Sequence, residues 1–334
     1  MSSPPVIEVR DLVKVYGGET RAVDGIGFEV ASGELFGFLG PNGAGKTTTI
    51  RILATLLSAT SGTARVAGFD VASQPEEVRR RLGLAMQAPA LDAFSTGRET
   101  IELAGRLHRV PSSELKRRTD ELLELTGLTK VAKKLTGTYS GGMRRRLDLA
   151  SALVHRPDVL ILDEPTEGLD PQSRTALWEE LERIGESGTT MLLTTHYMEE
   201  ADRLCSRLAI IDEGRIVVEG APADLKRSVG VDTVVLELDG AEADGAVERQ
   251  REDVRLLLDG VVAPEAIAPH AGGVSLAIEN ASTAIPHLLR RLDDDRVRIS
   301  GLRMSQPSLD DVFLRYTGRH IREEAADQPL VIGW

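Results

Sequence analysis

The chain has 334 residues, 41% of them hydrophobic and 28% charged, with a formal net charge of −12 at pH 7. This balance is that of an ordinary globular protein with a sizeable core, and the length predicts two domains. The acidic charge argues against nucleic acid as the main partner, because phosphate binding needs a basic footprint, but it does not exclude a local basic patch.

Several missing features narrow the class of protein further. No apolar run approaches the ~20 residues that a membrane helix needs. Residues 1–9 lack the charged and apolar regions of a signal peptide, so we expect cytosolic residence. The single cysteine, Cys205, excludes an internal disulfide and is expected to be a small buried packing residue. The six histidines show no metal-ligand spacing, so we expect no zinc site.

The chain opens with two predicted strands, at residues 6–16 and 22–30. Both interleave apolar and polar residues, which is typical of half-buried strands in one antiparallel patch. Tyr16 ends the first run and offers an aromatic face for stacking on adenine. The alternative is a tyrosine at a strand edge with no ligand.

A glycine-rich loop follows the predicted buried strand 34–39 and precedes the predicted helix 48–57. It matches the phosphate-binding pattern G-x-x-x-x-G-K-[ST] at every fixed position. Backbone N–H groups of such a loop converge on phosphate oxygens, and the helix N-terminus favours negative charge. The residues expected to surround the phosphates are Gly40, Pro41, Asn42, Gly43, Ala44, Gly45, Lys46, Thr47 and Thr48. Within this set, Lys46 is expected to reach the β- and γ-phosphates and the Thr47 hydroxyl to hold magnesium.

A glutamine lies at the end of the next buried strand. Residues 63–68 predict a strand and turn, 75–81 a charged helix and 82–86 a strand that delivers Gln87 at its C-terminal end. In open parallel sheets, ligands sit outside this end of the strands. Gln87 is therefore placed to reach both magnesium and the attacking water, the alternative being an ordinary loop residue.

Residues 89–137 are predicted to be mostly helical, as part of an inserted helical subdomain spanning about 89–155. It contains Ser140, Gly141 and Gly142 at the start of a long helix, which is a second anion-binding pattern. The three arginines that follow, at 144–146, are interpreted for the most part as a solvated face.

Two acids end the buried strand 159–164. Two like charges are costly to bury, so a structural role is disfavoured. Asp163 is expected to hold magnesium through its water shell, and Glu164 to orient and polarise the attacking water. The next strand, 189–195, delivers His196, whose imidazole can contact the γ-phosphate; the alternative is a helix cap.

Residues 222–318 are predicted to form a second unit. The strands are expected at 231–238, 274–278 and 297–304, and the helices at 247–258, 284–292 and 308–316. This alternation predicts a small α+β domain of ferredoxin-like type. Residues 319–334 are predicted to be a flexible tail.

The order and spacing of these motifs resemble those of the ATP-binding cassette (ABC) ATPases, over residues 5–221. The resemblance implies an α/β P-loop NTPase fold with a mixed sheet core, an antiparallel β patch and a helical subdomain. By this resemblance Ser140, Gly141 and Gly142 form the signature turn, and Asp170 is the D-loop aspartate. The implied catalytic residues are Glu164, His196, Gln87 and Lys46, the implied magnesium ligands are Thr47, Gln87 and Asp163, and Tyr16 stacks on adenine. The implied cofactors are ATP and Mg²⁺.

The signature departs from the family's usual Leu-Ser-Gly-Gly-Gln at its two outer positions. Tyr139 and Met143 stand there, and methionine cannot donate the hydrogen bonds of a glutamine. The run from Tyr139 to Arg146 resembles the branch of daunorubicin-resistance ATP-binding subunits and related bacterial drug, antibiotic and glycolipid exporters. Residues 307–314 resemble the C-terminal segment that this branch uses for assembly; the alternative is an ordinary amphipathic helix.

The resemblance implies a function as well as a fold. Two cassettes would sandwich two ATP molecules head to tail, each site taking Ser140 and Gly142 from the other chain, which is a second copy or a homologous cassette. A separate membrane permease would dock in a groove formed by residues 89–102 and hold the subunit on the cytoplasmic side of the membrane. The subunit would then drive export of a drug, antibiotic or lipid-like substrate.

Three rival functions are weighed against this one. A non-transport cassette ATPase acting on nucleic acid or ribosomes usually has two cassettes or a long coiled-coil insertion, and neither is present here. A regulatory cassette that binds ATP without hydrolysis is disfavoured by Glu164 and His196. An importer subunit is disfavoured by the C-terminal unit.

Overall fold

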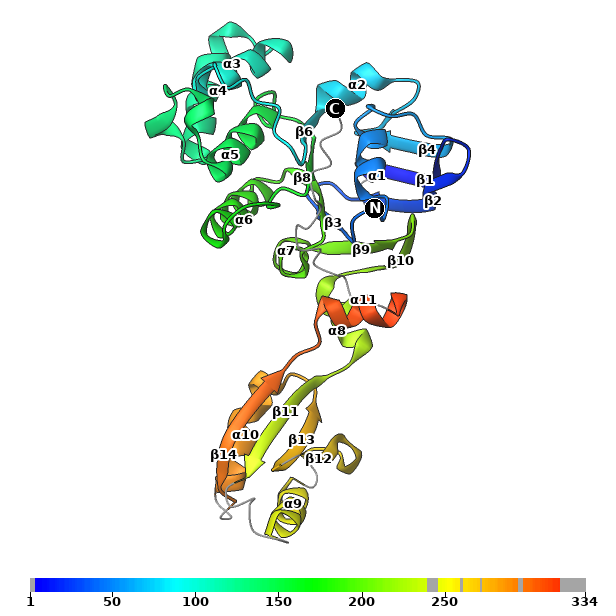
Figure 1. Cartoon of the computed structure of the whole chain (residues 1–334), viewed down its shortest axis with the longest axis vertical. Coiled ribbons are helices and arrows are strands. Elements are labelled where there is room, and N and C mark those ends of the chain that lie inside the picture. The colour runs from blue at the N-terminus through cyan, green and yellow to red at the C-terminus, as the bar shows by residue number, and fades with distance from the viewer. Residues whose placement is uncertain (1–3, 239–245, 259–260, 271, 294–296, 319–334) are drawn as a thin grey trace, which may run out of the picture. The chain divides into compact units, whose positions relative to one another are not determined.

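The computed structural model describes residues 4–238, 246–258, 261–270, 272–293 and 297–318. The chain divides into two compact units (Figure 1). The first unit contains the chain up to Pro222 and again from Tyr316 onward. The second unit is Ala223–Arg315. The predicted flexible tail, 319–334, lies outside the described residues.

A six-stranded sheet forms the centre of the first unit. Its strand order is β10-β9-β3-β8-β7-β6, in which only β10 runs antiparallel to its neighbour. The strands are β3 (Leu35–Leu39), β6 (Leu82–Ala85), β7 (Val159–Asp163), β8 (Thr190–Thr195), β9 (Arg207–Asp212) and β10 (Arg215–Gly220). Every residue of β7 and β8 is buried, as expected for parallel strands covered on both faces. The C-terminal ends of the parallel strands therefore meet at one edge.

An antiparallel sheet packs on this centre, with the order β2-β1-β4-β5. Its strands are β1 (Ile7–Tyr16), β2 (Thr20–Val30), β4 (Ser61–Val66) and β5 (Phe69–Asp70). Phe28 of β2 stacks on Phe36 of β3, with ring centroids 5.5 Å apart, and meets Phe38 edge to face at 4.8 Å. These buried rings join the two sheets and fix the strand that leads into the glycine loop.

Helices surround the two sheets. They are α1 (Lys46–Leu53), α2 (Pro75–Arg81), α3 (Gly97–Leu107), α4 (Ser112–Leu125), α5 (Gly141–Ala152), α6 (Pro171–Glu186) and α7 (Met198–Leu204), with short 3₁₀ turns η1 (Thr129–Val131) and η2 (Thr136–Thr138). The first turn of α3 is closed by a capping box between Thr96 and Glu99. Helices α3, α4 and α5 pack on one another, with α5 beside β6, and form a separate group in Figure 1.

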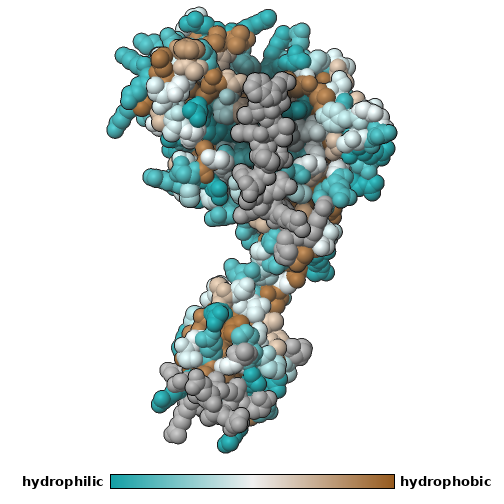
Figure 2. All heavy atoms as spheres, viewed as in Figure 1, coloured by the Kyte–Doolittle hydropathy of each residue, from teal (hydrophilic) through white to brown (hydrophobic). Residues whose placement is uncertain are grey.

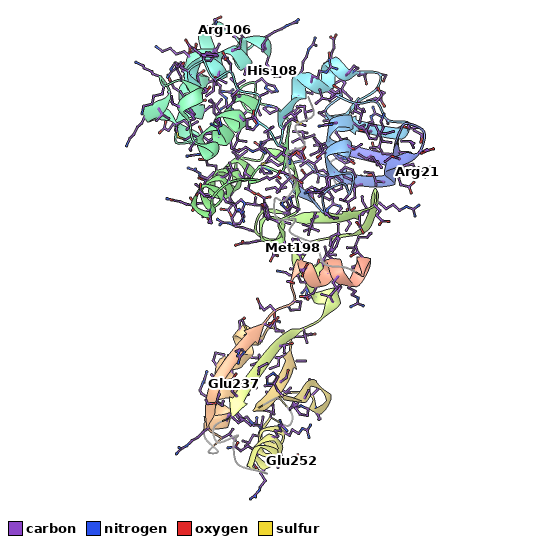
Figure 3. The ribbon with its side chains drawn as sticks, viewed as in Figure 1. Arg21, Arg106, His108, Met198, Glu237 and Glu252 are labelled. Carbon is purple, nitrogen blue, oxygen red and sulfur yellow. The ribbon has the colours of Figure 1, made fainter. Side chains whose placement is uncertain are left out.

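The second unit contains a four-stranded antiparallel sheet with the order β12-β13-β11-β14. The elements are α8 (Pro222–Val229), β11 (Asp232–Leu238), α9 (Ala246–Leu257), η3 (Pro264–Ala266), β12 (Ile267–His270), β13 (Gly273–Ile278), α10 (Ala281–Asp293), β14 (Ile299–Ser305) and α11 (Leu309–Thr317). One core joins buried residues of the strands to α9 and α10, among them Val234, Val254 and Leu288. Glu237 of β11, labelled in Figure 3, pairs with Arg303 of β14. Between β11 and β14 the connectivity is β-α-β-β-α-β, which confirms the ferredoxin-like prediction.

The predicted fold class, an α/β P-loop cassette with a mixed sheet core, an antiparallel patch and a helical part, plus a small α+β unit, is confirmed. Three elements of the second unit were not predicted, namely β12, α8 and the 3₁₀ turn η3. Strand β12 has a single buried residue and contains Pro269, so it lacks the alternation typical of strands. Helix α8 is short and polar, with Asp224, Lys226 and Arg227 among its residues.

Candidate nucleotide-binding site

The glycine loop connects the end of β3 to the first residue of α1, Lys46. Gly45 has φ +103°, and a Cβ there would lie 2.4 Å from the carbonyl oxygen of Ala22. A Cβ on Gly40 would lie 2.2 Å from the carbonyl oxygen of Ile211. Only glycine fits these two positions, because both approach neighbouring backbone closely and Gly45 also has a left-handed conformation. The predicted helix 48–57 ends earlier, at Leu53, since Thr55 has φ +61°.

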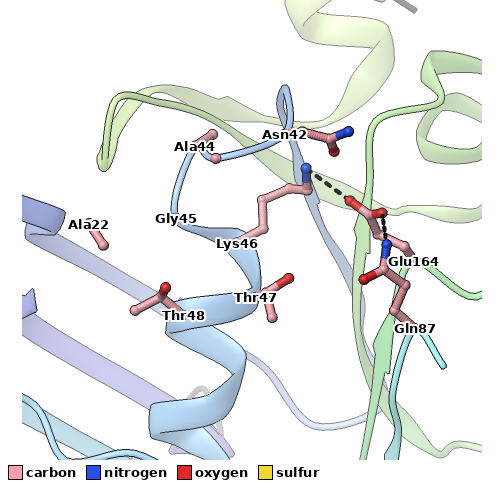
Figure 4. A pocket seen from close by; sticks show the side chains of 10 residues that line it. Ala22, Asn42, Ala44, Gly45, Lys46, Thr47, Thr48, Gln87 and Glu164 are labelled. Carbon is pink, nitrogen blue, oxygen red and sulfur yellow. Dashed lines mark hydrogen bonds and ion pairs between the residues drawn. The ribbon is translucent and has the colours of Figure 1, made fainter. Parts of the chain in front are cut away.

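An open pocket of about 270 Å³ lies against this loop (Figure 4). It is lined by Ala22, Asn42, Gly43, Ala44, Gly45, Lys46, Thr47, Thr48, Gln87 and Glu164. The first turn of α1 points its free backbone N–H groups toward the pocket, which is the arrangement that favours phosphate. The structure thus brings residues 42–48 together with two side chains from distant strands.

Lys46 places a buried positive charge at the loop. Its Nζ donates to the carbonyl oxygens of Gly40, at 2.7 Å, and Pro41, at 3.0 Å. It also forms an ion pair with Glu164 Oε1 at 3.1 Å, drawn as a dashed line in Figure 4. The ammonium group can therefore exchange these oxygens for phosphate oxygens without a change of backbone.

Asp163 carries a buried oxygen that lacks a hydrogen-bond partner. Its Oδ1 accepts from Thr194 Oγ1 at 2.6 Å and from Thr47 Oγ1 at 3.2 Å, whereas the buried Oδ2 accepts none. An unsatisfied carboxylate oxygen beside a hydroxyl fits a hard divalent cation. No cluster of three or more His, Cys, Asp or Glu that could hold a metal occurs among the described residues. This donor set suits Mg²⁺, which keeps waters and phosphate oxygens as its other ligands.

Glu164 is held at the pocket in an uncommon backbone conformation. Its φ is +46°, and its N–H donates to Thr194 O and Oγ1, both at 3.1 Å. Burial by itself raises the pKa of Glu164, but the neighbouring imidazole of His196 and the charge of Lys46 outweigh it and lower the pKa to about 2. The carboxylate is therefore ionised at neutral pH and able to accept a hydrogen bond from water.

Gln87 follows β6 and turns its amide toward the acids. Its Nε2 donates to Glu164 Oε2 at 3.2 Å and also to a carboxylate oxygen of Glu167. Burial, followed by the contact with Glu164, raises the pKa of Glu167 although Gln87 opposes the shift. The structure thus places Gln87 with Glu164, and its predicted role as a magnesium ligand stays a prediction.

His196 follows β8 with its ring against Tyr197, at a centroid distance of 4.1 Å. Its Nδ1 lies 3.6 Å from Glu164 Oε1. The N-cap of α7 is Tyr197, so the alternative prediction of a helix cap at His196 is wrong. The imidazole instead lies beside the carboxylate of Glu164, which lines the pocket.

Nine predicted residues do not line the pocket. Four of them lie next to residues that do, namely Gly40, Pro41, Asp163 and His196. The other five are Tyr16, Ser140, Gly141, Gly142 and Asp170. Ser140 is the N-cap of α5 and accepts from the N–H of Met143 at 3.2 Å. Asp170 is the N-cap of α6 and accepts from the N–H of Ser173 at 2.9 Å. A Cβ on Gly142 would lie 2.8 Å from Ser173 Oγ, so the two turns lie close together. Tyr16 is 39% exposed, with Lys14 Nζ 5.3 Å from its ring centroid.

Tyr139, the first departure from the usual signature, points into the helical part of the unit. Its side chain is buried and its hydroxyl donates to Val131 O at 2.8 Å. A Cβ on Gly97 would lie 2.3 Å from that hydroxyl. The ring therefore fills space beside α3 and takes no part in the exposed turn that follows it.

The sequence interpretation missed Arg145. This side chain is buried, and its guanidinium donates to backbone oxygens on both sides of Glu164 and to the end of β6. Reading 144–146 as a solvated face was wrong for this residue. The signal was its spacing, because Arg145 lies three residues after Gly142 and four before Leu149, on the buried face of α5.

Comparisons with known proteins identify the class. The family profile described as ABC transporter matches residues 23–167, and that of the ATP-binding protein DrrA1-3-like C-terminal domain matches residues 220–317. The structure of an ATP-binding subunit of an ABC transporter matches with a TM-score of 0.61 and 30% identity, over 67% of this chain and 92% of that chain. cbiO1 of Clostridium perfringens, part of an ABC transporter complex, matches with a TM-score of 0.62 and 28% identity, over 67% and 91%. The fold is that of an ATP-binding cassette.

Full-length relatives place the chain within this class. Daunorubicin resistance ATP-binding protein DrrA2 of Streptomyces coeruleorubidus is 45% identical over 93% of this chain and 95% of its own. The daunorubicin/doxorubicin resistance protein DrrA of Streptomyces peucetius is 43% identical over 97% of each. Nod factor export ATP-binding protein I of Ralstonia nicotianae is 39% identical over 97% of each. The chain therefore belongs to the ABC transporter ATP-binding proteins, in their DrrA-like branch.

The predicted family is thus confirmed, and the chain is an ATP-binding protein and an ATPase. The geometry agrees, since Lys46 and Glu164 face one pocket beside the phosphate loop. Among the helices that the structure describes, none is both long and apolar enough to cross a membrane.

Proposed function

We propose that this chain is the ATP-hydrolysing subunit of an exporter for a drug, an antibiotic or a lipid-like compound. The observation that carries the proposal is the position of Glu164 at the phosphate loop, with its carboxylate 3.1 Å from Lys46 Nζ and 3.6 Å from His196 Nδ1. The relatives named for daunorubicin resistance and for Nod factor export support the class of cargo.

Thr47 and Asp163 are the residues that would hold Mg²⁺ with the nucleotide. Thr47 Oγ1 lies 3.2 Å from Asp163 Oδ1, and Asp163 Oδ2 is buried without a protein partner. Bound there, the ion would neutralise charge on the β- and γ-phosphates. A neutral hydroxyl and one carboxylate leave most of the coordination to water and phosphate, as Mg²⁺ prefers.

The chain's own residues account for the hydrolytic step, in which water attacks the γ-phosphate and gives ADP and phosphate. Lys46 leaves its carbonyl and carboxylate partners for the phosphates, which frees one oxygen of Glu164. Glu164 then orients the attacking water through its freed carboxylate oxygen. Gln87, bonded to the other carboxylate oxygen at 3.2 Å, fixes the direction of the carboxylate plane.

A second cassette would complete each site. Ser140 and Asp170 cap the helices α5 and α6 at exposed positions outside the pocket of their own chain. A turn of this kind can bind the phosphates held by another copy, and a two-fold arrangement lets both chains do so at once. The proposed partner is a second copy of this chain or a homologous cassette, and nucleic acid is not among the proposed partners.

A separate permease would provide the path through the membrane and hold this subunit at its cytoplasmic face. Phe94, between Gln87 and α3, is 87% exposed, and Leu107 of α3 is 75% exposed. Figure 2 shows apolar side chains among polar ones over this helical part. A side chain as exposed as that of Phe94 is free to pack against a partner, and the resemblance to the family assigns docking to the segment that contains it. We therefore place permease docking at residues 89–102.

The activity is tested by steady-state ATP hydrolysis of the purified chain. Glu164→Gln should lower kcat by about 10²- to 10⁴-fold while ATP binding persists, and removal of Mg²⁺ by chelation should stop wild-type turnover. Glu199→Gln, on the exposed side of α7, is the matched control and should behave as wild type. ATP binding without turnover in the wild-type chain would favour the rival function of a regulatory cassette, and a Glu164→Gln variant as active as wild type would reject the role of Glu164.

Docking is tested by export from cells that contain the permease which co-purifies with this chain. Phe94→Ala or Leu91→Ala should abolish export while ATP binding persists. Leu56→Ala, an exposed leucine outside 89–102, serves as the control and should leave export intact. Full export by the Phe94 and Leu91 variants would remove the docking assignment.

A further inference from the structure

Arg145 is a buried cation whose side-chain N–H groups donate to backbone carbonyl oxygens. Its Nε donates to Pro165 O at 2.7 Å and its Nη2 to Asp163 O at 2.8 Å. Its Nη1 donates to Met86 O and, at 3.4 Å, to Gln87 O. The guanidinium thus bridges two segments that are distant in sequence, one at the end of β6 and one at the end of β7.

The four acceptors bracket the reacting side chains. Asp163 and Pro165 flank Glu164, whose φ of +46° must be held by its surroundings. Gln87, whose backbone oxygen is one of the acceptors, directs its amide to the same carboxylate. One side chain therefore fixes the peptide planes around both Glu164 and Gln87.

An ordinary ion pair does not account for this arrangement. The nearest carboxylate oxygen is Asp148 Oδ2, 3.8 Å from Nη1 and without a hydrogen bond. A pair at that distance does not require the planar fork of an arginine, whereas donation to oxygens in several directions does. Lysine in this position would keep the charge and lose the fork.

Arg145 also belongs to the helix that begins at the signature turn. It lies three residues after Gly142, on the first turns of α5, whose N-cap is Ser140. A shift or rotation of α5 would therefore move the guanidinium against the backbone that carries Glu164. Gly142 and Arg145 are only three residues apart in one helix, so a movement of the turn at Gly142 is passed on to Arg145 almost undiminished.

We propose that Arg145 is a positioning residue which couples the signature turn at 140–142 to Gln87 and Glu164. When the turn engages nucleotide held by the second chain, Arg145 sets the backbone on both sides of Glu164 for reaction. This inference rests on the proposed two-chain site, and it assigns the coupling to one side chain.

The test compares Arg145→Lys and Arg145→Gln with Arg144→Lys and Arg144→Gln. Arg144 is the neighbouring exposed arginine of the same helix and is the matched control. Both Arg145 variants should keep the wild-type affinity for ATP, while kcat falls by about 10- to 100-fold because the reacting groups are misplaced. Hydrogen exchange should rise at residues 86–88 and 163–166 and nowhere else. The Arg144 variants should match wild type in all three measurements.

Three outcomes would overturn the inference: an unchanged kcat, a loss of ATP affinity in step with kcat, or a loss of the folded state in both Arg145 variants. The last two would make Arg145 a binding or a folding residue. Glu164→Gln in the wild-type background separates this failure from a failure of the proposed function. If Glu164→Gln is inactive and Arg145→Lys is normal, only the coupling role is rejected.

Discussion

The chain has two turns that can bind an anion at a helix N-terminus, and they differ in what surrounds them. The loop 40–48 faces a pocket that also contains Gln87 and Glu164, with Lys46 already held in it. The turn 140–142 opens α5 with an exposed serine and lines no part of that pocket. The loop 40–48 thus has candidate catalytic side chains beside it in the same chain, whereas the turn 140–142 has none in that pocket. This difference supports the proposal that the second turn works on another chain's nucleotide.

The largest expected effect falls on the first turn. Lys46→Ala removes the charge that meets the phosphates and leaves Glu164 without its ion-pair partner at 3.1 Å. We expect kcat to fall by about 10²- to 10³-fold, with weaker ATP binding as well. Stopped-flow phosphate release and nucleotide titration measure the two quantities. If the Lys46→Ala variant turned over ATP as fast as wild type, the loop 40–48 would not be the catalytic turn of the pair.

The second prediction concerns Glu180 of α6, which lies beside Arg146 of α5, the helix that begins at the turn 140–142. Burial, only partly opposed by Arg146 on α5, raises the pKa of Glu180 to about 7. A carboxyl with a raised pKa keeps its proton in the folded state after the unfolded chain has lost it, so stability falls as pH rises from about 4.5 to 7.

Glu180→Gln should therefore stabilise the protein at pH 8, by up to about 3 kcal/mol, and have little effect at pH 4. Denaturant titrations at the two pH values measure this difference. Glu179→Gln, exposed and adjacent, is the control and should show no such pH dependence. A larger stabilisation at pH 4 than at pH 8 would contradict the assignment.

The second turn itself should give a smaller effect on turnover than the loop. Ser140→Ala removes one hydroxyl donor to a charged phosphate, so kcat should fall by about 10- to 100-fold. Nucleotide binding to the dilute single chain should not change, since Ser140 does not line the pocket. Ser151→Ala, in the last turns of the same helix, is the control. Weaker ATP binding by the dilute Ser140→Ala chain would show that the turn contacts the nucleotide of its own chain, which contradicts the assignment.

The smallest effect concerns Tyr16. If its ring stacks on adenine, Tyr16→Ala should raise KM for ATP by about 3- to 10-fold and leave kcat unchanged, whereas Tyr16→Phe should behave as wild type. An unchanged KM in the alanine variant would leave Tyr16 as the strand-edge tyrosine of the alternative interpretation. Steady-state kinetics at saturating Mg²⁺ make the measurement.

The same contrast explains what the sequence could predict. The loop 40–48 was predictable because its function depends on local spacing between a strand and a helix. The meeting of Thr47 with Asp163 depends on the sheet order, in which β8 lies between β3 and β7, and no local pattern contains that order. Only the resemblance to a known family supplied it.

Arg145 and His196 show the limits of local patterns from two sides. Three consecutive arginines look alike in a sequence, yet only Arg145 is buried, because burial depends on which face of α5 meets β6. His196 carried two interpretations, and the fold removes the helix cap because the N-cap position of α7 is Tyr197, while the contact with the γ-phosphate stays a prediction. Residues that act through tertiary contacts need the structure.

The most direct test of the shared site mixes two inactive variants, Lys46→Ala and Ser140→Arg. A mixed pair has one damaged site and one site with an intact loop from one chain and an intact turn from the other. Equal mixing should therefore restore ATP hydrolysis to about one quarter of the wild-type rate, because half of the random pairs carry one working site of two. No recovery on mixing, with both variants folded and shown to pair, would contradict the account.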